Sequence, residues 1–242
     1  MKSATLTFFV ALATLAAADR SFTVTNNCAY TVWPALFTGT GTAPSQATGW
    51  ELAAGTTATF SAPDNWTSGR IWPRTECDAS GSCATGGCDG GLECTGPASA
   101  ATPATIAEFT FSASQAVPDN YDVSIVDGFN VPVKVASSSG CAEASCPADL
   151  NASCPTALQF KDASGAVVGC FSDCQVDSDP TNSPSCCTGS FNTPSTCPAS
   201  RVPHYAFFKT NCPEAYVFPY DETSEPLTCT DKPNYTVTFC PA

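Results

Sequence analysis

Charged side chains are scarce in this chain of 242 residues, because Asp, Glu, Lys and Arg make up 13% of it. An average soluble domain has about a quarter. Basic residues are the scarcer kind, with 9 Lys and Arg against 22 Asp and Glu, and the formal net charge is −13. This argues against a nucleic-acid partner, since phosphate binding needs clustered cations. The single His also excludes a His-rich metal site or a His relay.

Long apolar runs are missing as well, except near the N-terminus. There, residues 6–15 are apolar, Lys2 precedes them and Ala16-Ala17-Ala18 follows them, a pattern typical of a secretory signal peptide. The run is too short to anchor the chain in a bilayer, which takes about 20 residues, so we expect no transmembrane segment. We expect cleavage after Ala18, which removes the charge of Lys2 and leaves residues 19–242 as a secreted protein of the extracellular space or cell wall.

Cysteine, in contrast, is abundant. An even number of 16 behind a signal peptide predicts eight disulfides. A zinc site using close pairs such as Cys170 and Cys174 is disfavoured, because such thiolate sites belong mainly to reducing compartments. We therefore expect no metal and no cofactor. Spacing alone leaves the pairing open, since 16 cysteines allow on the order of two million pairings.

Hydrophobic residues (43%) and aromatic residues (10%) are numerous enough to bury a core, so disorder is excluded. Alternating apolar and polar residues, bounded by turn residues, predict strands rather than long helices. The segment 21–37 predicts a hairpin or two successive strands. The other expected strands are 50–60, 69–74, 105–111, 121–127, 129–135 and 235–240, with one short helix over 203–211 and an Asp127-Gly128 tight turn.

Two cysteine-rich stretches, 77–94 and 141–212, hold too little apolar sequence to build cores of their own. The fold class we expect is therefore an all-β sandwich with disulfide-held loop lobes. Three Asn-x-Ser/Thr sequons predict N-glycosylation at Asn65, Asn151 and Asn234.

Several motifs in one order make the chain resemble the thaumatin-like proteins over its whole mature length. They are Asn27-Cys28-x-Tyr30-Thr31-Val32-Trp33, Gly69-Arg70-Ile71-Trp72, Ala107-Glu108-Phe109, Tyr121-Asp122-Val123-Ser124, Asp127-Gly128-Phe129-Asn130, the Cys186-Cys187 doublet, Phe207-Phe208-Lys209 and Thr238-Phe239-Cys240-Pro241. The chain departs from the family at Thr85-Gly86-Gly87-Cys88, where an Asp normally precedes the cysteine.

The resemblance implies a thaumatin-like β-sandwich core over residues 19–74, 105–146 and 213–242. It also implies a small disulfide lobe over 75–104 and a large one over 147–212. The pairing it implies is Cys28–Cys240, Cys77–Cys83, Cys88–Cys94, Cys141–Cys229, Cys146–Cys212, Cys154–Cys170, Cys174–Cys186 and Cys187–Cys197.

The family has an acidic cleft, whose residues carry over to Arg70, Glu108, Asp122, Asp127 and Asp221 in this chain. The resemblance implies a weak endo-β-1,3-glucanase, with Glu108 as general acid, Asp127 as base or nucleophile, and the other three binding the polysaccharide. The alternative is a non-catalytic protein that uses the same cleft to bind β-glucan or another cell-wall polysaccharide in antifungal defence. A basic surface underlies the sweet taste of some members, so the acidic balance excludes that role here. We expect a monomer.

The residues themselves support part of this picture. Glu108 alternates with Ala107 and Phe109, so it faces outward from a strand. Asp122 and Asp127 are an odd number apart and can converge only if the turn at Gly128 breaks the alternation. Carboxyl groups around one guanidinium acquire different pKa values, as glycoside hydrolysis requires.

Two other kinds of residue were candidates for chemistry. His204 lies in the expected helix and is given a structural role, because no nucleophile motif accompanies it. The four tryptophans, Trp33, Trp50, Trp66 and Trp72, could stack on sugars, but buried core aromatics are commoner, and Trp72 is expected in the core.

Overall fold

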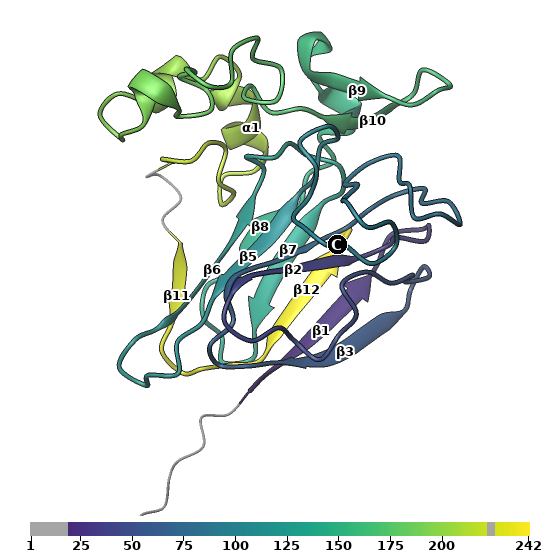
Figure 1. Ribbon diagram of the computed structural model, residues 1–242, viewed down its shortest axis with the longest axis vertical. Coiled ribbons are helices and arrows are strands. Elements are labelled where there is room, and N and C mark those ends of the chain that lie inside the picture. The colour runs from purple at the N-terminus through teal and green to yellow at the C-terminus, as the bar shows by residue number, and fades with distance from the viewer. Residues whose placement is uncertain (1–18, 222–225) are drawn as a thin grey trace, which may run out of the picture.

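The computed structural model describes residues 19–221 and 226–242, and the expected signal peptide lies outside them. Two five-stranded sheets pack face to face (Figure 1). The first has the order β3 (Thr57–Ala62), β1 (Arg20–Asn26), β12 (Tyr235–Phe239), β7 (Val133–Ser137) and β8 (Ala144–Cys146). The second has the order β11 (Leu227–Cys229), β6 (Asp119–Ser124), β5 (Ile106–Thr110), β4 (Thr67–Trp72) and β2 (Ala35–Thr40).

The core between the sheets is rich in aromatic rings. Alternate residues of β1 and β12 are buried, as the period of a strand requires. Phe22 of β1 makes an edge-to-face contact with Phe109 of β5 at 4.9 Å between ring centroids, and it also packs against Trp66 and Tyr235. These contacts join the two sheets, so the sandwich is confirmed.

Longer insertions cover one end of the sandwich. The upper part of Figure 1 holds a hairpin of β9 (Gln159–Lys161) and β10 (Val167–Cys170), and the helix α1 (Tyr205–Asn211). Four short 3-10 segments lie in the same part of the chain: η1 (Asn151–Ser153), η2 (Thr156–Leu158), η3 (Gly189–Phe191) and η4 (Ala199–Arg201). Residues 75–104 contain no helix or strand. A small apolar cluster joins them to the second sheet through Trp72 and Ile106.

All eight disulfides form with the pairing that the family resemblance implies. Cys28 follows β1 and Cys240 follows β12, so their bridge closes a sequence separation of 212 residues beside two neighbouring central strands. Five of the other bridges lie within residues 75–104 and 147–212, where strands and helices are few, while Cys229 and Cys146 anchor the remaining two bridges in β11 and β8.

Several expected elements differ from the structure. The segment 21–37 is not a hairpin, because β1 and β2 belong to different sheets and β1 pairs in parallel with β12. The strand expected over 50–60 is β3, which begins at Thr57. Asp127-Gly128 does not join a hairpin either, because the chain leaves β6 there and crosses to β7 in the other sheet. Apolar alternation marks a strand but does not identify its partner.

Candidate functional site

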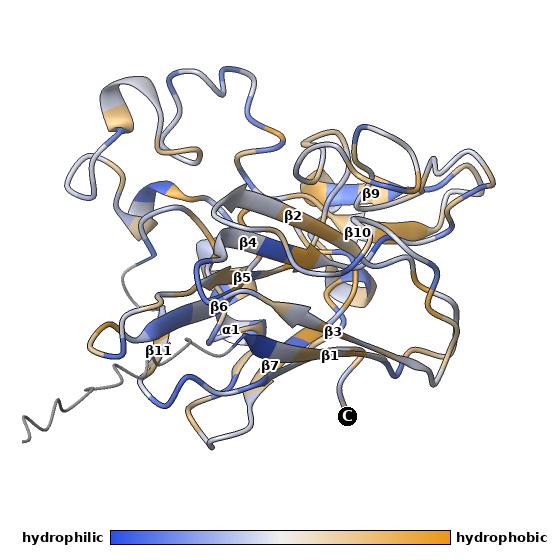
Figure 2. Cartoon of the chain, turned by 60° about the horizontal axis from the view of Figure 1, so that its bottom comes forward, coloured by the Kyte–Doolittle hydropathy of each residue, from blue (hydrophilic) through white to orange (hydrophobic). Residues whose placement is uncertain are grey.

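Three polar side chains lie in one row across the outer face of the second sheet. Arg70 of β4 is the register partner of Glu108 in β5, and Glu108 is the partner of Asp122 in β6. Their strand neighbours Ile71, Ala107 and Val123 point into the core and are buried. The inward packing therefore fixes the outward direction of the row. Figure 2 shows β4, β5 and β6 side by side, with hydrophilic residues among hydrophobic ones.

Asp127 joins this row from beyond the end of β6. The chain turns after Ser124, and Gly128 has a φ of +82°, a left-handed conformation that glycine adopts at little cost. The turn breaks the alternation, as convergence with Asp122 requires. Arg70 Nε lies 2.8 Å from Glu108 Oε1, and Arg70 Nη1 lies 3.6 Å from Asp127 Oδ2. One guanidinium therefore bridges two carboxylates.

These groups line an open cleft of about 350 Å³. Its wall includes residues that sequence reasoning missed, and the lining is Arg70, Glu108, Asp122, Ser124, Val126, Asp127, Tyr216 and Pro219. Ser124 could have been found, since it is two residues from Asp122 on one strand and shares its face. Tyr216 could not, because it reaches the cleft through backbone hydrogen bonds with Val123 and Ile125 across a large sequence distance.

Burial raises the pKa of all three cleft carboxyls, and the charge of Arg70 opposes that rise. The effect is largest at Asp122, where burial and the neighbouring Glu108 carboxylate raise the pKa to about 8. One oxygen of Asp122, Oδ1, is buried and accepts no hydrogen bond. A buried carboxylate without donors is unfavourable, so this environment favours the protonated form of Asp122.

Asp221 is placed elsewhere than the sequence led us to expect. Its side chain is 1% exposed, and it accepts hydrogen bonds from Lys209 Nζ at 3.0 Å, from the Tyr205 hydroxyl at 2.9 Å and from the Val217 amide at 3.1 Å. It is not among the described residues that line the cleft. Asp221 ties α1 to the segment that carries Tyr216, so within the described residues it supports the cleft wall.

The other candidate residues have structural partners. His204 Nδ1 lies 2.6 Å from Asp173 Oδ1, and the His204 backbone amide donates to the other oxygen of Asp173. Trp66 and Trp72 are fully buried, so the expectation for Trp72 is confirmed. Trp33 and Trp50 are partly exposed.

The three sequons differ in accessibility. Asn65 and Asn234 are exposed. Asn151 is partly buried, and its amide nitrogen donates to the backbone oxygen of Asn130 at 2.9 Å. A glycan on Asn151 would have to break this contact at a partly buried side chain, whereas Asn65 donates only to the hydroxyl of the exposed Thr42 at 3.2 Å. Exposure therefore favours the other two sites.

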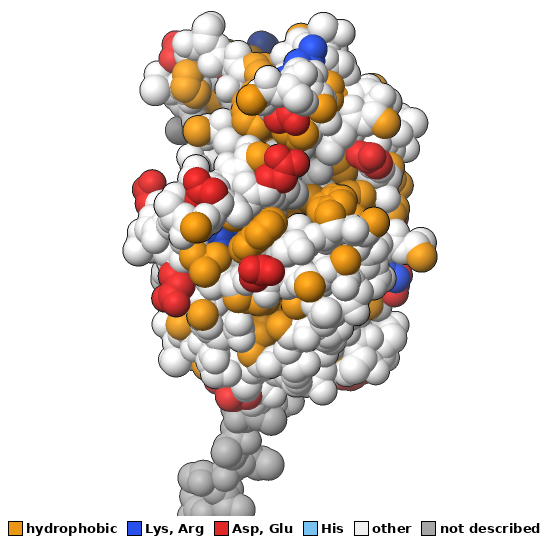
Figure 3. Space-filling model, turned by 90° about the vertical axis from the view of Figure 1, so that its right-hand side faces the viewer, with side chains coloured by type: hydrophobic (Ala, Val, Ile, Leu, Met, Phe, Trp, Pro, Cys, Tyr) orange, Lys and Arg blue, Asp and Glu red, His pale blue; other side chains and the backbone are white. Residues whose placement is uncertain are grey.

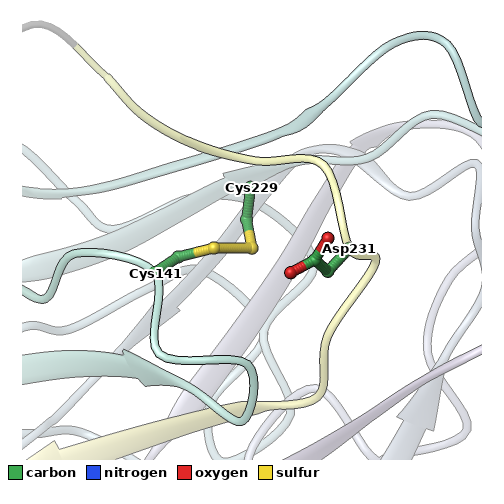
Figure 4. Close-up of side chains that lie close together, drawn as sticks. All are labelled: Cys141, Cys229 and Asp231. Carbon is green, nitrogen blue, oxygen red and sulfur yellow. A yellow bond between two sulfur atoms is a disulfide. The ribbon is translucent and has the colours of Figure 1, made fainter.

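One group of potential metal-binding residues occurs in the described part of the chain. Figure 4 shows Asp231 beside the disulfide between Cys141 and Cys229. Disulfide sulfurs are not thiolates, and a metal needs the thiolate. A single carboxylate remains, which is too few ligands for a metal site.

Fold and cleft together define a disulfide-rich β-sandwich protein with an acidic cleft built around one arginine. The family model described as the Thaumatin family matches residues 26–241. The chain therefore belongs to the thaumatin family.

Comparison with known proteins gives the same family. The chain is 46% identical over 228 residues to thaumatin-like protein 1 of Prunus persica, covering 90% of this chain and 89% of that protein. It is 43% identical over 223 residues to a protein of Prunus avium named glucan endo-1,3-beta-glucosidase, covering 89% of this chain and 88% of that one. A solved thaumatin-like xylanase inhibitor is similar at 21% identity with a TM-score of 0.46, covering 91% of this chain and 99% of the inhibitor. That last likeness carries no argument about activity.

No helix within residues 19–221 and 226–242 combines the length and the apolar character that crossing a membrane requires.

Proposed function

We propose that this protein is a secreted hydrolase that cleaves β-1,3-glucan in the acidic cleft. The observation that carries the proposal is the set of three carboxyl groups around Arg70, one of which, Asp122, has a raised pKa and a buried oxygen without a hydrogen bond. Hydrolysis of a glycosidic bond needs a protonated acid together with an ionised base or nucleophile. The name of the Prunus avium relative supports the choice of β-1,3-glucan as substrate.

In this proposal Asp122 donates the proton to the leaving oxygen. Glu108 and Asp122 interact strongly enough to titrate as a pair, and the positive charge of Arg70 lies on Glu108 at 2.8 Å. We assign the proton of the pair to Asp122, because Arg70 stabilises the ionised form of Glu108 while Asp122 Oδ1 is buried without a donor. This moves the acid's role from Glu108 to its neighbour. Asp127, 35% exposed, is open enough to activate water or attack the sugar, and it keeps the role of base or nucleophile.

Secretion is part of the same proposal. Eight disulfides persist in an oxidising compartment, and the N-terminal pattern predicts export to one. A polysaccharide of the cell wall is met in that compartment.

The test is sugar release by the mature chain from linear β-1,3-glucan. Asp122→Asn should lower turnover by about 10²-fold or more, the usual contribution of a general acid. The same variant should keep most of its activity on an aryl β-glycoside of a β-1,3-linked glucose oligosaccharide. The bond cleaved there releases a phenolate, which leaves without being protonated by the enzyme. The exposed variant Asp162→Asn is the matched control and should leave both activities unchanged.

Each alternative predicts a different result. If Glu108 is the acid, Glu108→Gln loses turnover on glucan and retains activity on the aryl substrate. Asp122→Asn then does not show this pattern. A wild-type protein that adsorbs to insoluble glucan without releasing sugar assigns the cleft to binding alone, as in an antifungal binding protein. A wild-type protein that neither binds nor cleaves β-1,3-glucan contradicts the proposal.

A further inference from the structure

A second pocket, of about 390 Å³, lies outside the acidic cleft and shares no lining residue with it. Its lining comes from five parts of the chain: the loop after β1, the start of the 75–104 segment, the turn between β6 and β7, the segment η1 and strand β10. The residues are Tyr30, Thr31, Trp33, Thr75, Glu76, Asn130, Asn151, Val167 and Val168. Only the short turn from Asp127 to Asn130 separates the cleft from this pocket along the chain.

The pocket lies on the side of the molecule that carries β10 and the loop after β1, at the right in Figure 1. Figure 3 views that side and shows hydrophobic side chains gathered across the waist of the molecule, with acidic side chains near them. Tyr30 lines the pocket and is 49% exposed. An exposed aromatic ring beside a pocket is a feature that a ligand can use.

Hydrogen bonds connect several of the segments that line the pocket. Trp33 and Arg74 exchange two backbone hydrogen bonds, at 2.9 and 3.1 Å. Asn130 donates to the Pro73 carbonyl at 2.8 Å, and Asn151 donates to the Asn130 carbonyl at 2.9 Å. The pocket is therefore formed before any ligand arrives, which lowers the entropic cost of binding.

Polar groups at the rim lack partners in the protein. Within the described residues, no hydrogen bond or ion pair engages the Glu76 carboxylate, the Thr31 hydroxyl or the Trp33 indole N–H. Glu76 also has a φ of +50°, a left-handed conformation in which a non-glycine residue is strained. Such strain is concentrated at functional sites.

We infer that this pocket is a second carbohydrate site, which binds a neutral pyranose residue of the glucan chain. The apolar face of the sugar packs on Tyr30 and Trp33, and its hydroxyls meet Glu76 and Thr31. The choice of β-1,3-glucan as the polymer rests on the proposed function. The assignment to a neutral pyranose rests on the pocket itself.

The lining disfavours charged ligands. It contains no Lys or Arg, so it offers no partner for a phosphate or a uronic acid. A quaternary ammonium ion favours a cage of aromatic faces, whereas this pocket offers two aromatics and several hydroxyl and amide groups. An apolar pocket with a few placed polar groups suits a neutral ring that carries hydroxyls.

The test measures adsorption to insoluble β-1,3-glucan together with turnover of the soluble aryl β-glycoside. Tyr30→Ala and Glu76→Gln should each weaken adsorption by about tenfold and leave kcat/KM on the soluble substrate unchanged. Val117→Ala, at a 47% exposed residue outside the pocket, is the matched control and should change neither. Normal adsorption by both pocket variants would overturn the inference.

A titration followed by tryptophan fluorescence separates this inference from the proposed function. The probes are the pentasaccharides of β-1,3-glucose, β-1,4-glucose and β-1,4-xylose, each added to the wild type and to Trp33→Phe. A signal that any of them produces in the wild type and that Trp33→Phe loses supports the pocket, even if the cleft cleaves no glucan. The inference fails if none of the three produces such a signal, or if choline chloride displaces the sugar.

Discussion

The acidic cleft contains a residue whose chemistry conflicts with stability. Asp122 holds one carboxyl oxygen buried without a hydrogen bond, and its pKa is raised from 3.8 to about 8. Between these pH values the folded protein keeps a proton that the unfolded chain has lost. The free energy of unfolding therefore falls as pH rises through this window, and the stabilising proton is gone above the folded pKa.

Asp122→Asn should remove this pH dependence, because the amide stays neutral. At pH 4 the variant and the wild type should be equally stable. At pH 8.5 the variant should be more stable by about 1–3 kcal/mol, the penalty of an unsatisfied buried group. Urea unfolding at both pH values measures the difference. Equal stability of the two proteins at pH 8.5 would show that ionisation of Asp122 does not destabilise the folded protein.

Asp162 supplies the control with the opposite sign. Its hydrogen bonds from Ser164, Gly165 and Ala166 lower the pKa of its exposed carboxyl. The ionised carboxylate of Asp162 therefore stabilises the folded protein at pH values above its ordinary pKa. This stabilisation is lost as the pH falls through the pKa that Asp162 has in the folded protein. Asp162→Asn should therefore lose stability at pH 8.5 and change little below pH 3.

Arg70 controls the ionisation of the whole cleft. Its charge lowers the pKa of Glu108, Asp122 and Asp127 against the effect of burial. Arg70→Ala should raise all three pKa values, so the ionised base or nucleophile is lost at a higher pH. The acid limb of kcat/KM against pH should move upward by about one unit.

Arg70→Lys is the matched variant, since it keeps the charge and loses the planar fork of donors. It should leave the acid limb nearer to its wild-type position. If Arg70→Ala lowers kcat/KM equally at every pH, Arg70 acts in positioning the substrate and does not tune the carboxyl groups.

At the scale of elements, one arginine organises the segment 75–104. Arg74 is fully buried, and its guanidinium donates to the backbone oxygens of Trp33, Gly91 and Leu92 at 3.0, 3.0 and 2.7 Å. Burial lowers its pKa to about 10. The described residues provide carbonyl dipoles around this cation, and no carboxylate pairs with it. The guanidinium thus supplies hydrogen bonds to carbonyl groups of the loop backbone that have no partner in a neighbouring strand.

Arg74→Met keeps the length of the side chain and removes its donors. The carbonyls of Gly91 and Leu92 then lose the guanidinium as a donor, and the Trp33 carbonyl keeps only its bond from the Arg74 amide. The free energy of unfolding should fall by about 3 kcal/mol or more. Amide hydrogen exchange should become faster across residues 75–104, while the amides of β1 and β12 keep their relative protection. Uniformly faster exchange over the whole chain would contradict a local role for Arg74.

Elements also show what the sequence could predict. The alternation in β5 correctly placed Ala107 and Phe109 inside and Glu108 outside, because local periodicity is a property of the strand itself. The pairing of β1 with β12 could not be found in this way, since it depends on contacts about 200 residues apart. The burial of Asp221 could not be found for a related reason. Its burial follows from Lys209 and Tyr205 on α1, and no local pattern records that contact.

At the scale of the whole molecule, both ends of the chain are fastened to the sandwich. Arg20, two residues after the expected cleavage point, is buried and binds Asp119 through two hydrogen bonds at 2.9 and 3.1 Å. Lys232 Nζ lies 2.9 Å from the same carboxylate. The bridge from Cys28 to Cys240 ties β1 to the C-terminal end. The cysteine content of the sequence predicted a molecule cross-linked by disulfides. The acidic cleft and the second pocket could not be predicted in that way, because both are formed by segments that are far apart in the sequence.

The disulfides and the sandwich core stabilise different parts of this molecule. The aromatic core lies between the two sheets, while residues 75–104 and 147–212 are held largely by bridges between cysteines close in sequence. After partial reduction, limited proteolysis should therefore cut first within those two segments, and mass spectrometry of the fragments locates the cuts. Strands of the sandwich should be cut later, because their backbone groups are paired and buried.

A variant that lacks only the long bridge separates the two contributions. Cys28→Ser combined with Cys240→Ser should lower the free energy of unfolding by up to about 5 kcal/mol, the chain-entropy value for so long a loop. It should leave residues 75–104 and 147–212 resistant to protease without reductant, because their own bridges remain. If the fully reduced wild type resists protease as the oxidised protein does, the bridges are not what holds these segments. If the first cuts in the partly reduced protein fall within β1 or β12, the sandwich does not fold as a unit of its own.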